Sequence, residues 1–131
     1  AKQLDPHIWR FAFAIGGLST AVLNLNNMRD MQNDTKAGKK TVAAFLGLKS
    51  AKTYHSILVL GSITSLMAGL TNISDGWIGY APLLMVFPLL IQLKSTLKLK
   101  IHGTFDALLK PLALSIFGTS ILLLLTQIMG A

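Results

Sequence analysis

Two carboxylates lie close together in the most polar stretch of an otherwise apolar chain. Asp30 and Asp34 are four residues apart, so a helix through this stretch would place both on one face. Two like charges in that position repel each other by about 0.2–0.5 kcal/mol. A helix gains nothing from the pair unless a cation lies between the carboxylates or basic side chains neutralise them. The amide and basic side chains around them are Asn27, Arg29, Lys36, Lys39 and Lys40.

This set of side chains has the chemistry of a magnesium–diphosphate site. Carboxylate and amide oxygens are hard ligands, and Mg²⁺ is typically held by one or two carboxylates together with substrate phosphates and water. A guanidinium binds phosphate oxygens as a planar fork, and an ammonium binds them as a point charge. Gly38 lets the backbone turn sharply beside such a ligand. A solvated basic loop would have similar spacing, so the stretch alone leaves both interpretations open.

The composition indicates a membrane protein. The chain has 131 residues, of which 52% are hydrophobic and only 13% are charged, whereas about 25% of the residues of a soluble domain are charged. The absence of cysteine excludes disulfides and thiolate metal sites. The net charge of +7 is typical of cytoplasmic loops that face anionic lipid. No aromatic-rich basic groove favours nucleic acid as a partner.

Four segments without Asp, Glu, Lys or Arg are long enough to cross a bilayer, which takes about 17–25 residues. We expect each segment to form a transmembrane helix, and the fold to be an all-α transmembrane bundle in one domain. Pro82 and Pro88 each remove a backbone donor and should kink the third helix. The expected spans are residues 11–28, 53–74, 76–93 and 111–131.

Basic residues are concentrated in two connections between these spans. Residues 29–52 and 94–110 hold ten of the twelve lysines and arginines, whereas the turn at residues 71–76 holds none. Basic loops usually remain in the cytoplasm. We therefore expect a multi-pass protein of the cell (inner) membrane with both basic connections in the cytoplasm. The 71–76 turn and both ends of the chain would lie on the other side.

Local signals predict further helical structure in the two basic connections. Residues 41–48 are expected to form a short helix that ends at Gly47 and packs on the membrane surface or on a neighbouring helix. The last helix is expected to start near Thr104 and Asp106. Thr104 is suited to cap it, and Asp106 suits the positive end of the helix dipole. We expect a structural role for both residues.

The polar stretch also resembles a known motif. It closely resembles the second Asp-rich motif of the UbiA superfamily of intramembrane prenyltransferases. The Asn-Asn-x-Arg-Asp opening and the Gly-Lys-x-Thr close look most like the branch that acts on 1,4-dihydroxy-2-naphthoate in menaquinone biosynthesis. Residues 105–113, before the last helix, also resemble this branch. The matching pattern is Asn27-x-Arg29-Asp30-x3-Asp34-x3-Gly38-Lys39-x-Thr41, followed by Ala43, Leu46 and Gly47.

The resemblance implies a bundle of nine helices in which two Asp-rich motifs face each other across a central cavity. Each motif binds Mg²⁺ bridged by the diphosphate of a polyprenyl donor, and the metal and basic residues stabilise the departing diphosphate. The aromatic acceptor attacks the allylic cation so formed, and in the menaquinone branch the new bond replaces a carboxyl group lost as CO₂. By motif position, Asp30 and Asp34 are the catalytic, metal-binding carboxylates. Asn27 and Arg29 support them at the diphosphate.

The resemblance also suggests roles for the lysines that follow. Lys36 and Lys39 are expected to contact the diphosphate, whereas Lys40 falls at a variable position of the motif. The family's first Asp-rich motif has no counterpart here, because Asp75 is the next acidic residue after Asp34. The chain thus corresponds to about the last four of nine helices. We expect it to be inactive without N-terminal helices that carry the first motif.

Other functions stay open at this point. The aromatic acceptor could instead be 4-hydroxybenzoate, homogentisate or a chlorophyll precursor. A function of another class is a non-catalytic four-helix membrane subunit whose basic loops bind anionic lipid, and it predicts no specific affinity for diphosphate. The histidines form no metal-ligand pattern and are expected to pack in the bundle or at its interface: His7, His55 and His102.

Overall fold

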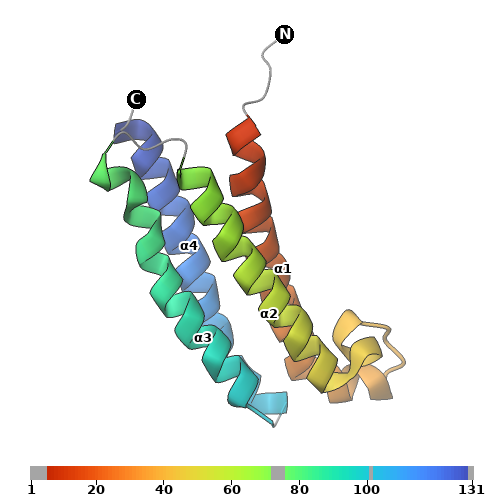
Figure 1. The fold of residues 1–131 in the computed structure, drawn as a ribbon. Coiled ribbons are helices and arrows are strands. Elements are labelled where there is room, and N and C mark those ends of the chain that lie inside the picture. Colours follow the sequence, from red (N-terminus) through yellow and green to blue (C-terminus); the bar gives the residue numbers. More distant parts are fainter. Residues whose placement is uncertain (1–5, 72–75, 101, 130–131) are drawn as a thin grey trace.

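The chain folds as a bundle of helices. The computed structural model describes residues 6–71, 76–100 and 102–129, and within these ranges it contains helices and short connections but no strand. Four helical units are long and apolar enough to cross a membrane, and they run side by side (Figure 1). The expected all-α bundle with four helices able to span a membrane is thus confirmed.

Successive units run in opposite directions along the bundle. Because the directions alternate, the first unit begins at the same end of the bundle at which the fourth unit ends (Figure 1). The third unit combines a 3-10 helix with an α-helix, and a short 3-10 turn precedes the fourth unit. In chain order the elements are α1 (Pro6–Lys36), α2 (Val42–Leu70), η1 (Trp77–Met85), α3 (Val86–Lys98), η2 (His102–Phe105) and α4 (Asp106–Met129).

Most of the connection that we expected between the first two spans is helical. Helix α1 continues about two turns beyond Met28, and only residues 37–41 separate it from α2. Thr41 caps α2, because its side chain accepts a hydrogen bond from the backbone N–H of Ala44 (3.2 Å). Gly47 interrupts α2 with φ 77° and ψ 160°. A short helix that ends at Gly47 is therefore present, as the sequence indicated.

The third unit contains two kinds of helix. The expected span at residues 76–93 starts as η1, which contains Pro82, and becomes α-helical at Val86. The expected kink thus takes the form of a 3-10 segment. Pro88 lies in the first turn of α3, where proline is tolerated. Residues 72–74, the end of the second expected span, and residue 75 after it lie outside the described residues.

Small and polar residues let α1 approach α2, and these two helices make the most extensive contact of the bundle. Gly17 faces Ser62 so closely that a methyl group on Gly17 would lie 2.2 Å from Ser62 Oγ. Asn24 Nδ2 donates a hydrogen bond to the carbonyl of Ala51 (2.9 Å). Small interface residues and hydrogen bonds of this kind stabilise helix pairs in an apolar surrounding.

Buried polar side chains also join α2 to α3. His55 is fully buried, and its Nε2 lies 3.4 Å from Oε1 of Gln92. Gln92 Nε2 in turn donates a hydrogen bond to Oγ1 of Thr96 (3.0 Å). His55 therefore packs inside the bundle, as expected, whereas the side chain of His102 lies outside the described part of the chain.

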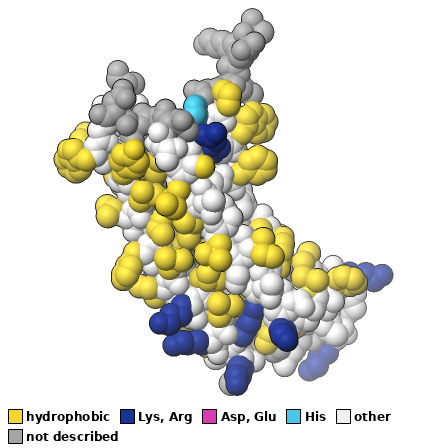
Figure 2. Space-filling model, in the orientation of Figure 1, with side chains coloured by type: hydrophobic (Ala, Val, Ile, Leu, Met, Phe, Trp, Pro, Cys, Tyr) yellow, Lys and Arg dark blue, Asp and Glu magenta, His cyan; other side chains and the backbone are white. Residues whose placement is uncertain are grey.

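The outer surface is apolar along the bundle and basic at one end. Figure 2 shows hydrophobic side chains along the helices and Lys and Arg side chains gathered mainly at one end. This basic end is where α1 and α3 end and where α2 and α4 begin. Exposed phenylalanines on the helices, such as Phe13, Phe87 and Phe117, suit contact with lipid. The lysines of the basic end are Lys36, Lys39, Lys40, Lys49, Lys52, Lys94, Lys98, Lys100 and Lys110.

Replacing Gly17 by leucine is expected to destabilise the bundle, because the new side chain would be forced against Ser62 and the α2 backbone. Overpacking of this kind costs about 1–3 kcal/mol. Gly16 is the matched control, since a methyl group there would meet no atom within 4 Å. Thermal unfolding in detergent should give a lower midpoint for Gly17→Leu than for Gly16→Leu. Equal midpoints would contradict the close packing of α1 on α2.

Candidate functional site

The polar stretch lies at the basic end, on the last turns of α1 and beyond the expected span at residues 11–28. Because α1 continues to Lys36, Asp30 and Asp34 occupy positions i and i+4 of one helix and share a face. The Asp34 side chain is only 11% exposed, whereas the Asp30 side chain is 40% exposed. Asn27 is half-buried about one turn before Asp30. The end of α1 thus carries the amide and both carboxylates.

Arg29 is bound to two carboxylates at once. Its Nε donates a hydrogen bond to Oδ1 of Asp30 (2.8 Å), and its Nη2 donates one to Oδ2 (2.9 Å). Its Nη1 donates a hydrogen bond to Oδ1 of Asp106 (2.9 Å), the first residue of α4. The hydrogen bonds from Arg29 hold the pKa of the Asp30 carboxyl below its ordinary value. The carboxylate of Asp30 is therefore stabilised in its ionised form.

The sequence did not indicate that Asp106 joins this group of charges. We expected Asp106 only to start α4, and it does occupy the first position of that helix. It also pairs with Arg29, 77 residues away in the chain. No local pattern links two such distant positions. Two signals were available: residues 105–113 resemble the same branch as the Asp-rich stretch, and the two basic connections, residues 29–52 and 94–110, hold three acidic residues in all: Asp30, Asp34 and Asp106.

The turn that ends α1 places Lys39 beside Asp34. Gly38 has φ 71°, and the N–H groups of Gly38 and Lys39 donate to the carbonyls of Thr35 (3.2 Å) and Asp34 (2.8 Å). These two bonds form a Schellman motif, in which glycine takes the left-handed conformation. Lys39 Nζ consequently lies 3.5 Å from Oδ1 of Asp34. Gly38 makes the sharp turn that we expected, and the turn brings a lysine to the second carboxylate.

The lysines of the stretch lie on the surface around this turn. Lys39 and Lys40 are exposed beside Gly38 and line a hollow of about 400 Å³. Lys36 lines a separate hollow of about 460 Å³ together with Gln32. The structure thus places Lys39 at Asp34 and Lys36 on another part of the surface.

The two carboxylates fit a metal ion that is shared with phosphate. Asp30 and Asp34 supply oxygen ligands, but across residues 6–71, 76–100 and 102–129 no three His, Cys, Asp or Glu side chains are grouped so that they could hold a metal ion. Mg²⁺ accepts so few protein ligands when substrate phosphates and water complete its shell. Arg29 and Lys39 lie against the two carboxylates and can bind phosphate oxygens. The donor set therefore fits a magnesium–diphosphate complex.

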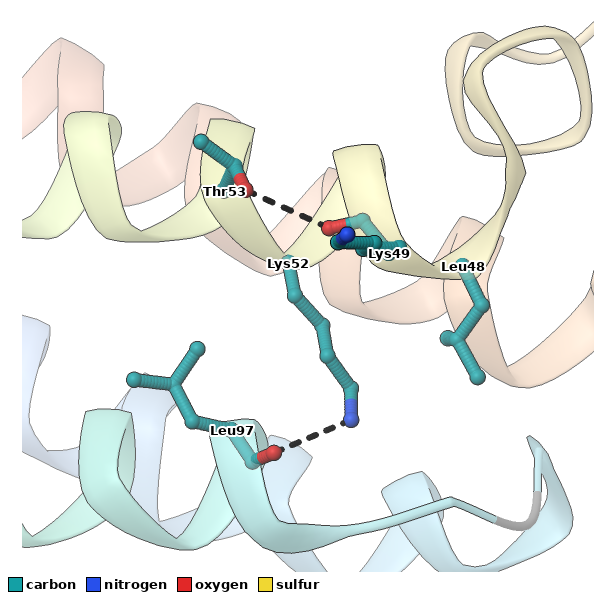
Figure 3. Close-up of a pocket in the computed structure, with 5 residues that line it drawn as sticks. All are labelled: Leu48, Lys49, Lys52, Thr53 and Leu97. Carbon is teal, nitrogen blue, oxygen red and sulfur yellow. Dashed lines mark hydrogen bonds between the residues drawn. The ribbon is translucent and has the colours of Figure 1, made fainter.

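Lys52 connects α2 to the end of α3 at the same end of the bundle. Figure 3 shows its side chain reaching from α2 to the end of α3, beside a hollow of about 510 Å³. Its Nζ donates to the carbonyls of Leu97 (3.0 Å) and Leu99 and lies 5.9 Å from the centre of the Phe105 ring. The last carbonyls of a helix have no hydrogen-bond donor within the helix, and the ammonium group of Lys52 donates to them here. The sequence indicated only a loop charge at this position.

Comparisons with known proteins agree with the motif. The profile of the UbiA prenyltransferase family matches residues 1–110. Over 90 residues, the chain is 38% identical to a 1,4-dihydroxy-2-naphthoate octaprenyltransferase of Haemophilus influenzae, and the match covers 69% of this chain and 29% of that protein. Over 93 residues, it is 39% identical to a protein of the same name of Escherichia coli, with 70% and 30% covered. The chain thus spans about 30% of the length of these relatives, and no solved structure matches it.

Replacing Gly38 by alanine is expected to loosen the end of α1, because a residue with a side chain is strained at φ 71° by about 1–2 kcal/mol. Asparagine tolerates this conformation better, so Gly38→Asn is the matched control. Trypsin cleavage after the lysines of this segment reports the change. The initial cleavage rate should rise for Gly38→Ala and stay near that of the unchanged protein for Gly38→Asn. Equal rates in all three proteins would show that the turn does not restrain the segment.

Proposed function

Because the chain belongs to the UbiA prenyltransferase family, we propose that its protein transfers a polyprenyl group from polyprenyl diphosphate to 1,4-dihydroxy-2-naphthoate in menaquinone biosynthesis. The observation that carries this proposal is the pair Asp30 and Asp34 at the end of α1, with Arg29 and Lys39 against them. Both similar proteins are named for that acceptor. The chain would contribute one side of the site, since it spans about 30% of their length.

The candidate site residues have distinct tasks in this reaction. Asp30 and Asp34 would hold the magnesium–diphosphate complex, and bound Mg²⁺ would withdraw charge from the diphosphate as it departs. Arg29 and Lys39 would bind phosphate oxygens. The negative charge that develops while the bond between carbon and oxygen breaks would then meet positive charge that is already in place. The motif positions of Asn27 and Lys36 suggest supporting contacts to the same diphosphate.

The complete enzyme needs a second side to this site. We propose that N-terminal helices with the family's first Asp-rich motif face Asp30 and Asp34, and that this chain alone would not turn over substrate. The lysines gathered at the basic end (Figure 2) support a position of this end in the cytoplasm, with the helices in the cell (inner) membrane. The diphosphate would then approach from the cytoplasmic side.

Asp30→Asn and Asp34→Asn in the complete enzyme are each expected to lower the prenyl-transfer rate at least about 10²-fold, the loss found when one charge-stabilising group is removed. Asn33→Ala, an exposed neighbour on α1, should stay near the original rate. The same prenyl-transfer assay, run on the unchanged enzyme, identifies the acceptor. It compares the rate with 1,4-dihydroxy-2-naphthoate against the rates with 4-hydroxybenzoate, homogentisate and a chlorophyll precursor.

Retained activity in both aspartate variants would rule out this site. Preference for another acceptor would replace the proposed substrate and leave the reaction class intact. A protein that neither transfers prenyl groups nor binds diphosphate would instead favour the non-catalytic membrane subunit.

Lys39→Gln is expected to raise the KM for polyprenyl diphosphate about tenfold, because a hydrogen bond to a charged group is worth about 1.5–3 kcal/mol. Lys40→Gln is the matched control. It removes the same charge one residue along, at an exposed position, and should change KM less than about twofold, as expected for an exposed charge. Steady-state kinetics of the complete enzyme measure both values. Similar increases in the two variants would point to general attraction by the basic end instead of a contact from Lys39.

A further inference from the structure

A cation bound at Asp30 would have to share its carboxylate with Arg29. Both oxygens of the Asp30 carboxylate accept hydrogen bonds from the guanidinium, one from Nε (2.8 Å) and one from Nη2 (2.9 Å). A magnesium–diphosphate complex at Asp30 would bring a second positive centre to the same two oxygens. Each carboxylate oxygen has a second lone pair, so the metal and the guanidinium could share Asp30, but their like charges would repel each other and weaken the hold of Arg29 on Asp30. The guanidinium would then depend more on its other anionic partners, which are the diphosphate and a second carboxylate.

Asp106 already provides that carboxylate. Nη1 of Arg29 donates a hydrogen bond to Oδ1 of Asp106 (2.9 Å), so the guanidinium is held by one carboxylate from α1 and by another from α4. The three nitrogens of Arg29 are thus divided between two helices. Withdrawal from Asp30 can occur while the bond to Asp106 is kept.

We propose that Asp106 is a positioning residue of the magnesium–diphosphate site, which holds Arg29 from α4 while Asp30 turns to the metal. This inference rests on the proposed function. Without Asp106, the guanidinium is held by Asp30 and the diphosphate alone, so it stays closer to Asp30 and competes more strongly with the metal there. The site also loses one negative charge, which lowers its attraction for a cation. Both effects weaken metal binding, and neither weakens the attraction for the diphosphate anion itself.

The position of Asp106 is itself well supported by the bundle. Asp106 directly follows Phe105, which is fully buried in the same core cluster as Met28 and Met31 of α1. Lys52 reaches from α2 to the end of α3 and lies near the Phe105 ring. Helices α1, α2 and α3 therefore all contribute to placing the first turn of α4 beside Arg29.

A purely structural role of Asp106 must be separated from this one. The Asp106 side chain is 70% exposed and lies in the first turn of α4, where a negative charge favours the helix dipole. The double variant Asp106→Asn/Ala107→Asp moves the charge by one residue. It keeps the net charge and the favourable interaction with the dipole, but it removes the carboxylate that pairs with Arg29 and leaves a neutral amide oxygen in its place. Asp106→Glu keeps a carboxylate at the original position.

The test measures metal binding in the complete protein in detergent. Mn²⁺ is titrated by electron paramagnetic resonance in the presence of saturating geranyl thiodiphosphate, an unreactive donor analogue. Asp106→Asn should raise the dissociation constant of Mn²⁺ about two- to fivefold, as expected for loss of an exposed ion pair. The double variant should show the same increase, and Asp106→Glu should restore most of the affinity. Thermal unfolding is recorded for each variant alongside.

Unchanged Mn²⁺ affinity in Asp106→Asn would overturn the proposal, and so would full recovery in the double variant, which would leave Asp106 a role at the helix dipole alone. If Asp106→Asn does not fold, Asp106→Ser, which also suits a helix start, takes its place. Failure of both to fold would make Asp106 a stability residue and would equally overturn the proposal. If the unchanged protein transfers no prenyl group, the proposed function fails, whereas the Mn²⁺ titration still decides the role of Asp106.

Discussion

A bilayer offers no hydrogen-bond partners to backbone or charged groups, and this constraint shapes the whole chain. The four units able to span a membrane satisfy their backbone groups as helices. They keep contacts such as that of Asn24 with Ala51 inside the bundle. Most charged side chains are left for the ends, and at the basic end both carboxylates of the Asp-rich stretch meet their cationic partners. Groups that a soluble protein could scatter over its surface are thereby concentrated in one place.

At the basic end, the interactions that complete the helix ends also assemble the candidate site. The last carbonyls of a helix need partners from outside the helix. Helix α1 obtains them through the turn at Gly38, which also brings Lys39 to Asp34. Helix α3 obtains them from Lys52, whose ammonium group lies near Phe105. Helix capping and the placement of charge are therefore achieved by the same contacts.

The features with local causes could be predicted from the sequence. Apolar length indicated four helices, the four-residue spacing placed Asp30 and Asp34 on one face, and Gly38 indicated a turn. The same spacing argument required a helix through the polar stretch, and α1 does continue past the apolar segment, because Arg, Met, Gln and Lys are good helix formers. The bond from Arg29 to Asp106 spans 77 residues of sequence. It depends on how α1 packs beside α4, and no local pattern records that packing.

Among the described residues, Gly38 and Gly47 are the two with positive φ, and this has a consequence for sequence divergence. Most other residues at either position would strain the backbone, with asparagine at Gly38 the better tolerated exception, so substitution there is usually penalised. Exposed positions between them, such as Lys40 and Val42, carry no such penalty. Related proteins can therefore exchange side chains along this segment while its path stays the same. Gly38 and Gly47 would keep the backbone path of this segment constant in related proteins, while its exposed side chains vary.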